Sequence, residues 1–173
     1  MLEQRIQQQF FEGADLQYQA AESLARPIAE ATAALWAAIT GGGKLMVCGS
    51  GAGAALAPYM ARLLTGRFER ERPPLAALSL GAEAVQQVRA LGLPGDLLLY
   101  IDDGEGQSTS VISAAQAKDM TILVLAGRGA QAFGELLAER PMCWSPYPTS
   151  APRAWPNCNC WYCIACAMRL ISS

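Results

Sequence analysis

The sequence predicts an α/β fold in which helices cover both faces of a parallel sheet, and three features of the chain lead to this prediction. Short segments that are apolar throughout alternate with helical segments over residues 44–141. Strands of this kind are buried on both faces, as in parallel sheets. A glycine-rich turn directly follows the first apolar segment. The 173 residues are 52% hydrophobic, which is enough to give one three-layer domain a substantial core.

Residues 1–43 predict a helical segment ahead of the sheet. Residues 2–25 are polar but carry apolar side chains at intervals that suit one helical face, at Leu2, Ile6, Phe10, Leu16 and Leu24. Pro27 stands where a second helix would begin, and residues 28–40 form that helix until three consecutive glycines end it. We therefore expect two N-terminal helices.

Residues 44–141 predict the α/β core. The expected strands cover residues 45–48, 75–80, 97–101 and 121–125, and the expected helices cover residues 54–67, 82–91, 108–118 and 130–138. Pro58 is tolerable only if it lies near the first turn of its helix. Ligands of such sheets bind at the carboxyl ends of the strands, so the loops after Cys48, Leu80 and Ile101 should converge.

The turn after the first strand, KLMVCGSGAG at residues 44–53, is the most informative stretch. Gly49, Gly51 and Gly53 expose backbone N–H groups at the start of a helix, where the positive helix end favours an anion such as a phosphate or phosphosugar. The same glycines also allow a strand to turn tightly into a closely packed helix. Both interpretations stay open. The dinucleotide pattern GxGxxG is not met, because Leu56 replaces its last glycine.

Composition excludes two classes of partner. The 13 basic and 15 acidic residues nearly balance, and the basic residues do not cluster, so we expect no direct binding of nucleic acid. No apolar stretch is as long as a membrane span, and the amino terminus is polar and rich in glutamine, unlike a signal peptide. The sequence therefore predicts a cytoplasmic protein that does not bind membranes.

Three segments carry a resemblance to a known family, at residues 48–80, 87–101 and 118–129. They resemble the sugar isomerase (SIS) domain family, and within it the phosphoheptose isomerases and, more closely, the DnaA initiator-associating proteins (DiaA). The similarity extends to about Arg153 and is most specific at residues 67–80. It implies a flavodoxin-like or Rossmann-like fold with a five-stranded parallel sheet, a homotetramer or homodimer, and a phosphosugar cleft between subunits.

The resemblance divides the chain, a single SIS domain over residues 1–173, into three parts. They are a helical preface at residues 1–43, the α/β core at residues 44–141 and an atypical tail at residues 142–173, which is rich in proline, cysteine and tryptophan.

The resemblance also implies a set of candidate phosphosugar-binding residues, namely Gly49, Ser50, Gly51, Gly53, Ser79, Asp102, Asp103 and Ser108. Where the family has an asparagine and a serine in its first loop, this chain has Ser50 and Gly53. The second loop, rich in serine and threonine in the family, here reads DDGEGQS at residues 102–108. Its carboxylates would repel a phosphate if they faced the cleft. Alternatively, they point to solvent and cap the helix that begins at Ser108.

Catalysis is the clearest departure from the family. The isomerases typically move a proton with a glutamate and a histidine, and histidine is also available to a metal. This chain contains no histidine, and Tyr59 and Leu63 stand at the family positions of that pair. Neither side chain titrates near neutrality, as a general acid or base should. The chain is also shorter than the family between Leu80 and Gln86. We therefore expect no catalytic residues, metal or cofactor, which favours a protein that is not an enzyme.

The tail contains four closely spaced cysteines, Cys158, Cys160, Cys163 and Cys166. Four thiolates suit zinc or an iron–sulfur cluster, but their spacing is irregular for zinc. Shifting the reading frame by one nucleotide across residues 157–166 instead gives a mostly leucine and valine segment that resembles the final helix of the family. We therefore interpret the tail as a frameshifted version of that helix, without a metal.

These observations lead to one main hypothesis of function and two alternatives. The main hypothesis is a non-catalytic, DiaA-like regulator that binds the initiator DnaA when chromosomal replication begins. The first alternative is a phosphoheptose isomerase-like protein that binds or isomerises a phosphosugar such as sedoheptulose 7-phosphate. The second alternative is a degenerate member of the family with a frameshifted tail.

Overall fold

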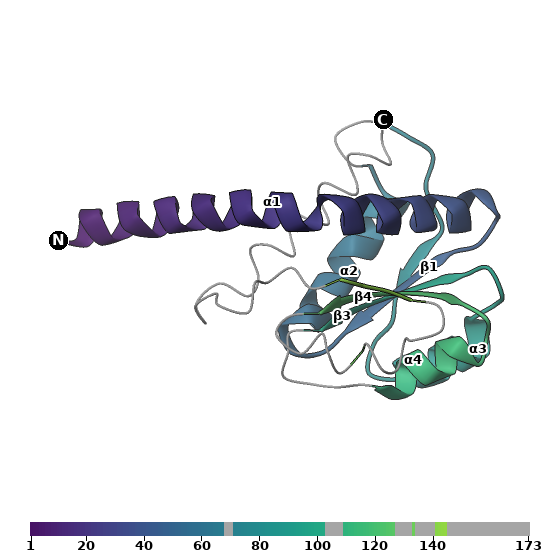
Figure 1. Ribbon diagram of the computed structural model, residues 1–173. Coiled ribbons are helices and arrows are strands. Elements are labelled where there is room, and N and C mark those ends of the chain that lie inside the picture. Colours follow the sequence, from purple (N-terminus) through teal and green to yellow (C-terminus); the bar gives the residue numbers. More distant parts are fainter. Residues whose placement is uncertain (68–70, 103–108, 127–132, 134–140, 145–173) are drawn as a thin grey trace.

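The computed structural model describes residues 1–67, 71–102, 109–126, 133 and 141–144 (Figure 1). A sheet lies at its centre, with the strand order β2-β1-β3-β4-β5, and every neighbouring pair is parallel. The strands are β1 (Leu45–Gly49), β2 (Ala77–Ser79), β3 (Leu97–Asp102), β4 (Thr121–Ala126) and β5 (Pro141–Trp144). The predicted α/β class with a parallel sheet is confirmed.

Helices cover both faces of this sheet. The long helix α1 (Leu2–Thr40) and α2 (Gly51–Thr65) pack on one face, while α3 (Ala84–Leu91) and α4 (Thr109–Gln116) pack on the other (Figure 1). Alternate strand residues belong to different core clusters: Met46 and Cys48 face α3 and α4, whereas Leu45 and Val47 face α1 and α2. This burial on both sides explains why the strands are apolar throughout.

The N-terminal segment is one continuous helix, so the prediction of two helices is wrong. Pro27 lies inside α1, where it removes one backbone hydrogen bond. Buried side chains lie on both sides of it, with Leu24 at 6% exposure and Leu35 at 4%. Because most helical stability in proteins comes from such packing, the helix continues through the proline.

The first half of α1 extends beyond the sheet (Figure 1). Leu2 is 73% exposed and Phe10 is 75% exposed, whereas Leu24 is buried. The predicted apolar face is therefore buried within the chain only towards its carboxyl end. In the parts of the chain that the structure describes, no helix is both long and apolar enough to cross a membrane.

Two further boundaries differ from the prediction. Helix α2 begins within the glycine turn, so Pro58 lies in its interior and not near its first turn. Pro58 is exposed, and water can therefore hydrate the carbonyl group that loses its partner. The resemblance implied a fifth strand, but no residues were assigned to it; β5 begins at Pro141, a strand position that tolerates proline at a sheet edge. The expected helix at residues 130–138 lies, except for Phe133, outside the described residues, as does the tail beyond residue 144.

A buried carboxylate joins the amino ends of β1 and β3, opposite the edge where a ligand is expected. Asp96, 2% exposed, accepts hydrogen bonds from the Lys44 backbone N–H (2.9 Å), the Lys44 ammonium (2.5 Å) and the Leu93 N–H (2.8 Å). Burial raises the pKa of this carboxyl, but these hydrogen bonds and the Lys44 charge outweigh that effect and hold it below its usual range.

Candidate functional site

The carboxyl ends of β1 and β3 meet at one edge of the sheet, as predicted. Gly49 is the register partner of Ile101, so Ser50 and Asp102 follow at the same level. The Ser50 N–H donates a hydrogen bond to the Ile101 carbonyl (3.0 Å). The Ser50 hydroxyl donates to Asp102 Oδ1 (2.7 Å). These two contacts place a hydroxyl and a carboxylate side by side next to the start of α2.

The glycines of the turn bring α2 close to β3. A Cβ atom on Gly49 would lie 2.5 Å from the Ile101 carbonyl oxygen and 2.7 Å from the Gly53 carbonyl carbon, and one on Gly53 would collide with the same Ile101 oxygen. Gly51, with φ of +47°, adopts a conformation that side chains rarely allow. Close packing therefore requires glycine at positions 49 and 53, which agrees with the tight-turn interpretation. The anion-binding interpretation depends on the groups around the turn.

The groups around the turn are the Ser50 hydroxyl and the Asp102 carboxylate. Ser50 is the N-cap of α2 and has an extended backbone, but its side chain makes no capping hydrogen bond to the helix. The side chain donates a hydrogen bond to Asp102 instead. The Asp102 side chain belongs to a residue that is only 6% exposed, and the positive end of α2 stabilises a carboxylate at this place. The alternative in which the loop acids point to solvent is therefore wrong for Asp102, while Asp103 and Ser108 lie outside the described residues.

The structure does not bring Ser79 to this pair. Ser79 is the register partner of Val47, three residues before Ser50, which corresponds to about 10 Å along a strand. Successive strand side chains point to opposite faces, and Ala77 packs against the cluster beneath α1 and α2. Ser79 therefore faces α2, whereas Asp102 follows Tyr100 on the face that α3 and α4 cover.

Tyr59 and Leu63, which replace the family's proton-moving residues, also lie away from the pair. Leu63 is 9% exposed and belongs to the core cluster between α2 and the sheet, and Tyr59 packs against the same cluster. Tyr59 lies about 12 Å along the helix axis from Gly51. Neither residue therefore lies at the glycine turn itself.

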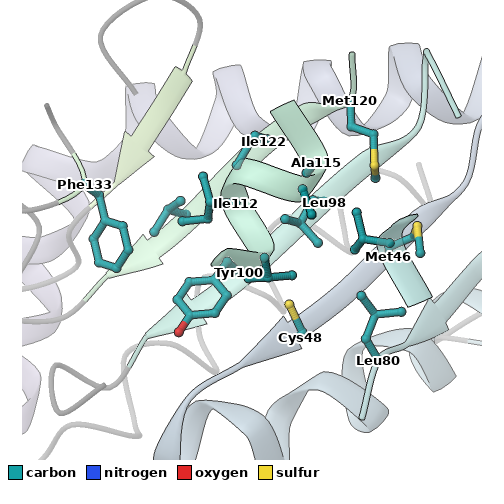
Figure 2. Packing of buried hydrophobic residues seen from close by; sticks show 14 of the residues in the cluster. Met46, Cys48, Leu80, Leu98, Tyr100, Ile112, Ala115, Met120, Ile122 and Phe133 are labelled. Atoms are coloured by element: carbon teal, nitrogen blue, oxygen red, sulfur yellow. The ribbon is translucent and has the colours of Figure 1, made fainter. Parts of the chain in front are cut away.

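The buried residues that precede Asp102 on the same face of the sheet were not singled out from the sequence. Tyr100 is 1% exposed and lies next to Cys48, its register partner on β1, on the face shown in Figure 2. The rings of Tyr100 and Phe133 lie 6.0 Å apart with their planes at 52°. Burial raises the pKa of the Cys48 thiol to about 12. The alternation of residues 98, 100 and 102 in β3 was the signal that could have shown that they share this face.

A parallel α/β sheet of this kind defines a class of proteins whose ligands bind at the carboxyl ends of the strands. Within that class, the chain belongs to the SIS domain family, whose model matches residues 9–127. It is 46% identical to a phosphoheptose isomerase of Methylibium petroleiphilum, over 80% of this chain and 78% of the relative. It is 39% identical to one of an Azoarcus species, over 78% and 77%.

Solved structures show the same fold. A phosphoheptose isomerase from Francisella tularensis superposes with a TM-score of 0.84 at 24% identity, over 99% of this chain and 98% of the other. One from Neisseria gonorrhoeae gives a TM-score of 0.79 at 24% identity, over 99% of both chains. This protein is thus a phosphoheptose isomerase-like SIS domain. Nothing in these comparisons supports the main hypothesis of a DnaA-binding regulator; they favour the first alternative.

Proposed function

We propose that this protein binds a phosphosugar, of the heptose phosphate class, at the carboxyl edge of its sheet. Relatives named phosphoheptose isomerase share up to 46% of their aligned residues with this chain. That level of identity supports a shared class of ligand. The proposal therefore corresponds to the first alternative that the sequence offered.

The observation that carries the proposal is the convergence at Ser50. Its backbone is held by Ile101, its hydroxyl is fixed by Asp102, and it forms the N-cap of α2. A hydroxyl, a helix start and a buried carboxylate at one edge provide both donors and acceptors for a polyhydroxylated ligand. The positive end of α2 stabilises the charge of this carboxylate.

The proposal is for binding without efficient isomerisation. Moving a proton between neighbouring sugar carbons requires a group that titrates near neutrality and reaches the ligand. In the described part of the chain, the positions that the family uses hold Tyr59, which packs against the core, and Leu63, which is buried in it. The whole chain has no histidine to take over this role.

Calorimetric titration with sedoheptulose 7-phosphate tests the binding. We expect the wild-type protein to bind with a dissociation constant of about 1 mM or lower, worth about 4 kcal/mol, and Ser50→Ala to bind about tenfold more weakly. Ser113→Ala serves as a matched control, because Ser113 is an exposed serine of α4. Wild-type protein that gives no heat up to saturating ligand would refute the proposal.

An isomerase assay on the same samples tests the second part. We expect no turnover above background, while an active phosphoheptose isomerase converts the same substrate preparation. Turnover that a Ser50→Ala substitution abolishes would show that the chain moves the proton with groups other than Tyr59 and Leu63.

A further inference from the structure

We propose that Asp102 is a specificity-determining residue that makes the glycine-turn site disfavour phosphate groups and favour sugar hydroxyls. The inference rests on the proposed function, because it concerns the same edge of the sheet. Its physical content is that the carboxylate of Asp102 occupies the place beside the start of α2 that an anionic group of a ligand would otherwise take.

The first step is the use of the Ser50 proton. A serine hydroxyl has a single proton to donate, and that of Ser50 is donated to Asp102 Oδ1 at 2.7 Å. While this bond persists, Ser50 cannot donate to a phosphate oxygen.

The second step concerns the negative charge of Asp102 at the start of α2. Asp102 lies at the end of β3, directly beside the N-cap residue of α2. Its negative charge therefore satisfies the positive end of the helix before any ligand arrives. A phosphate that approached the same point would meet a like charge, and the repulsion between like charges a few ångströms apart grows as solvent is excluded.

The third step is that Asp102 has little freedom to leave. The residue is 6% exposed, and its backbone is paired with Ala126 on β4. The residues that precede it on the same face of the sheet, Tyr100 on β3 and its register partner Cys48 on β1 (Figure 2), are buried and offer a poorly solvated surface. Screening by water is consequently weak on this side, and the carboxylate affects ligand choice more strongly than an exposed acid would.

As a consequence, the glycine turn prefers sugar hydroxyls to phosphate groups. An ionised carboxylate accepts hydrogen bonds only. It therefore pairs well with the hydroxyl groups of a sugar chain and poorly with a phosphate. The structure assigns the hydroxyl-bearing part of the ligand, and not its phosphate, to the place next to Ser50 and Asp102.

Binding of inorganic phosphate to full-length variants tests this assignment. Asp102→Asn keeps the shape of the side chain and an acceptor for Ser50 but removes the charge. We expect at least a tenfold gain in phosphate affinity over wild type. Asp119→Asn is the matched control, since Asp119 is exposed and has φ of +52°, a conformation that asparagine tolerates. It should bind phosphate as wild type does.

Asp102→Ser provides a second variant that removes the charge, in case the asparagine protein does not fold, and circular dichroism verifies folding of each. Equal phosphate affinity in wild type and the folded Asp102 variants would overturn the inference.

Parallel titrations with sedoheptulose 7-phosphate and with unphosphorylated sedoheptulose separate this inference from the proposed function. A gain for inorganic phosphate without any binding of the sugar phosphate would sustain the role of Asp102 and contradict the proposed function. Binding of the sugar phosphate to wild type, without a gain in inorganic phosphate affinity in the Asp102 variants, would support the proposed function and contradict the role of Asp102. Loss of sedoheptulose affinity in Asp102→Asn is expected, because the carboxylate is the better acceptor.

Discussion

Replacing Asp96 by alanine tests the buried contact that joins β1 and β3. The substitution removes an acceptor of three hydrogen bonds from Lys44 and Leu93. It leaves two backbone N–H groups unpaired and the Lys44 ammonium, on a side chain that is 25% exposed, without its counter-ion. Each unpaired buried group costs about 1–3 kcal/mol, and breaking a buried ion pair costs about 3–5 kcal/mol. We expect a total loss near the latter range, since the terms overlap.

A loss of this size is easily measured. For a domain of this length it corresponds to a fall in Tm of roughly 6–20 °C, and chemical denaturation at pH 7 gives the free energy directly. Asp96→Asn should lose less, because it keeps an acceptor. Asp119→Asn is again the control. A free energy of unfolding for Asp96→Ala within about 0.5 kcal/mol of wild type, the range of ordinary surface changes, would refute this account of the contact.

The same contact predicts a pH dependence with a definite sign. Because the pKa of Asp96 is lower in the folded than in the unfolded protein, its ionised form stabilises the fold above the unfolded pKa, which is about 3.9. That stabilisation is lost as the pH falls below about 4 towards the folded pKa. The stability difference between wild type and Asp96→Asn should therefore shrink in acid. A difference that is constant from pH 7 to pH 3 would contradict it.

Three further predictions concern single positions. Gly53→Ser should lower the free energy of unfolding by about 1–3 kcal/mol, since its Cβ would meet the Ile101 backbone. In the same denaturation experiment Gly81→Ala should change little, because its Cβ would meet no atom within 4 Å. Arg72→Ala should cost about 1–3 kcal/mol by removing hydrogen bonds of 2.6 and 3.2 Å to carbonyls at the end of α2; Arg72→Lys should recover only part of it. Cys48, whose pKa burial raises to about 12, should resist iodoacetamide at pH 8 until the protein is denatured, as peptide mass spectrometry would show.

The strands were predictable because burial on both faces leaves a direct trace in the sequence. Continuous apolar runs predicted β1, β3 and β4 to within one residue at their ends. The continuous helix α1 was not predictable, because a local signal, Pro27, is outweighed by side chains that become buried only in the folded chain. The position of the fifth strand was missed, since the four residues of β5 begin with a proline and carry no alternation long enough to recognise.

The site was predictable in position but not in detail. A glycine turn after the first strand placed Ser50 at the carboxyl edge, and the structure brings Asp102 to it. Whether Asp102 pointed to solvent or inward depends on the register of β1 against β3, which no local pattern contains. Ser79 was grouped with them because it ends a neighbouring strand, but its register and its face separate it from the pair.

The most direct test of the account is to locate the ligand by protein-observed NMR. In ¹H–¹⁵N spectra of the wild-type protein titrated with sedoheptulose 7-phosphate, the account predicts shifts for the amides of residues 49–53 and of Asp102. It predicts none for Lys44 and Leu93, which lie at the opposite ends of the strands. Shifts confined to that opposite edge, or spectra unchanged by saturating ligand, would contradict a phosphosugar site at the glycine turn.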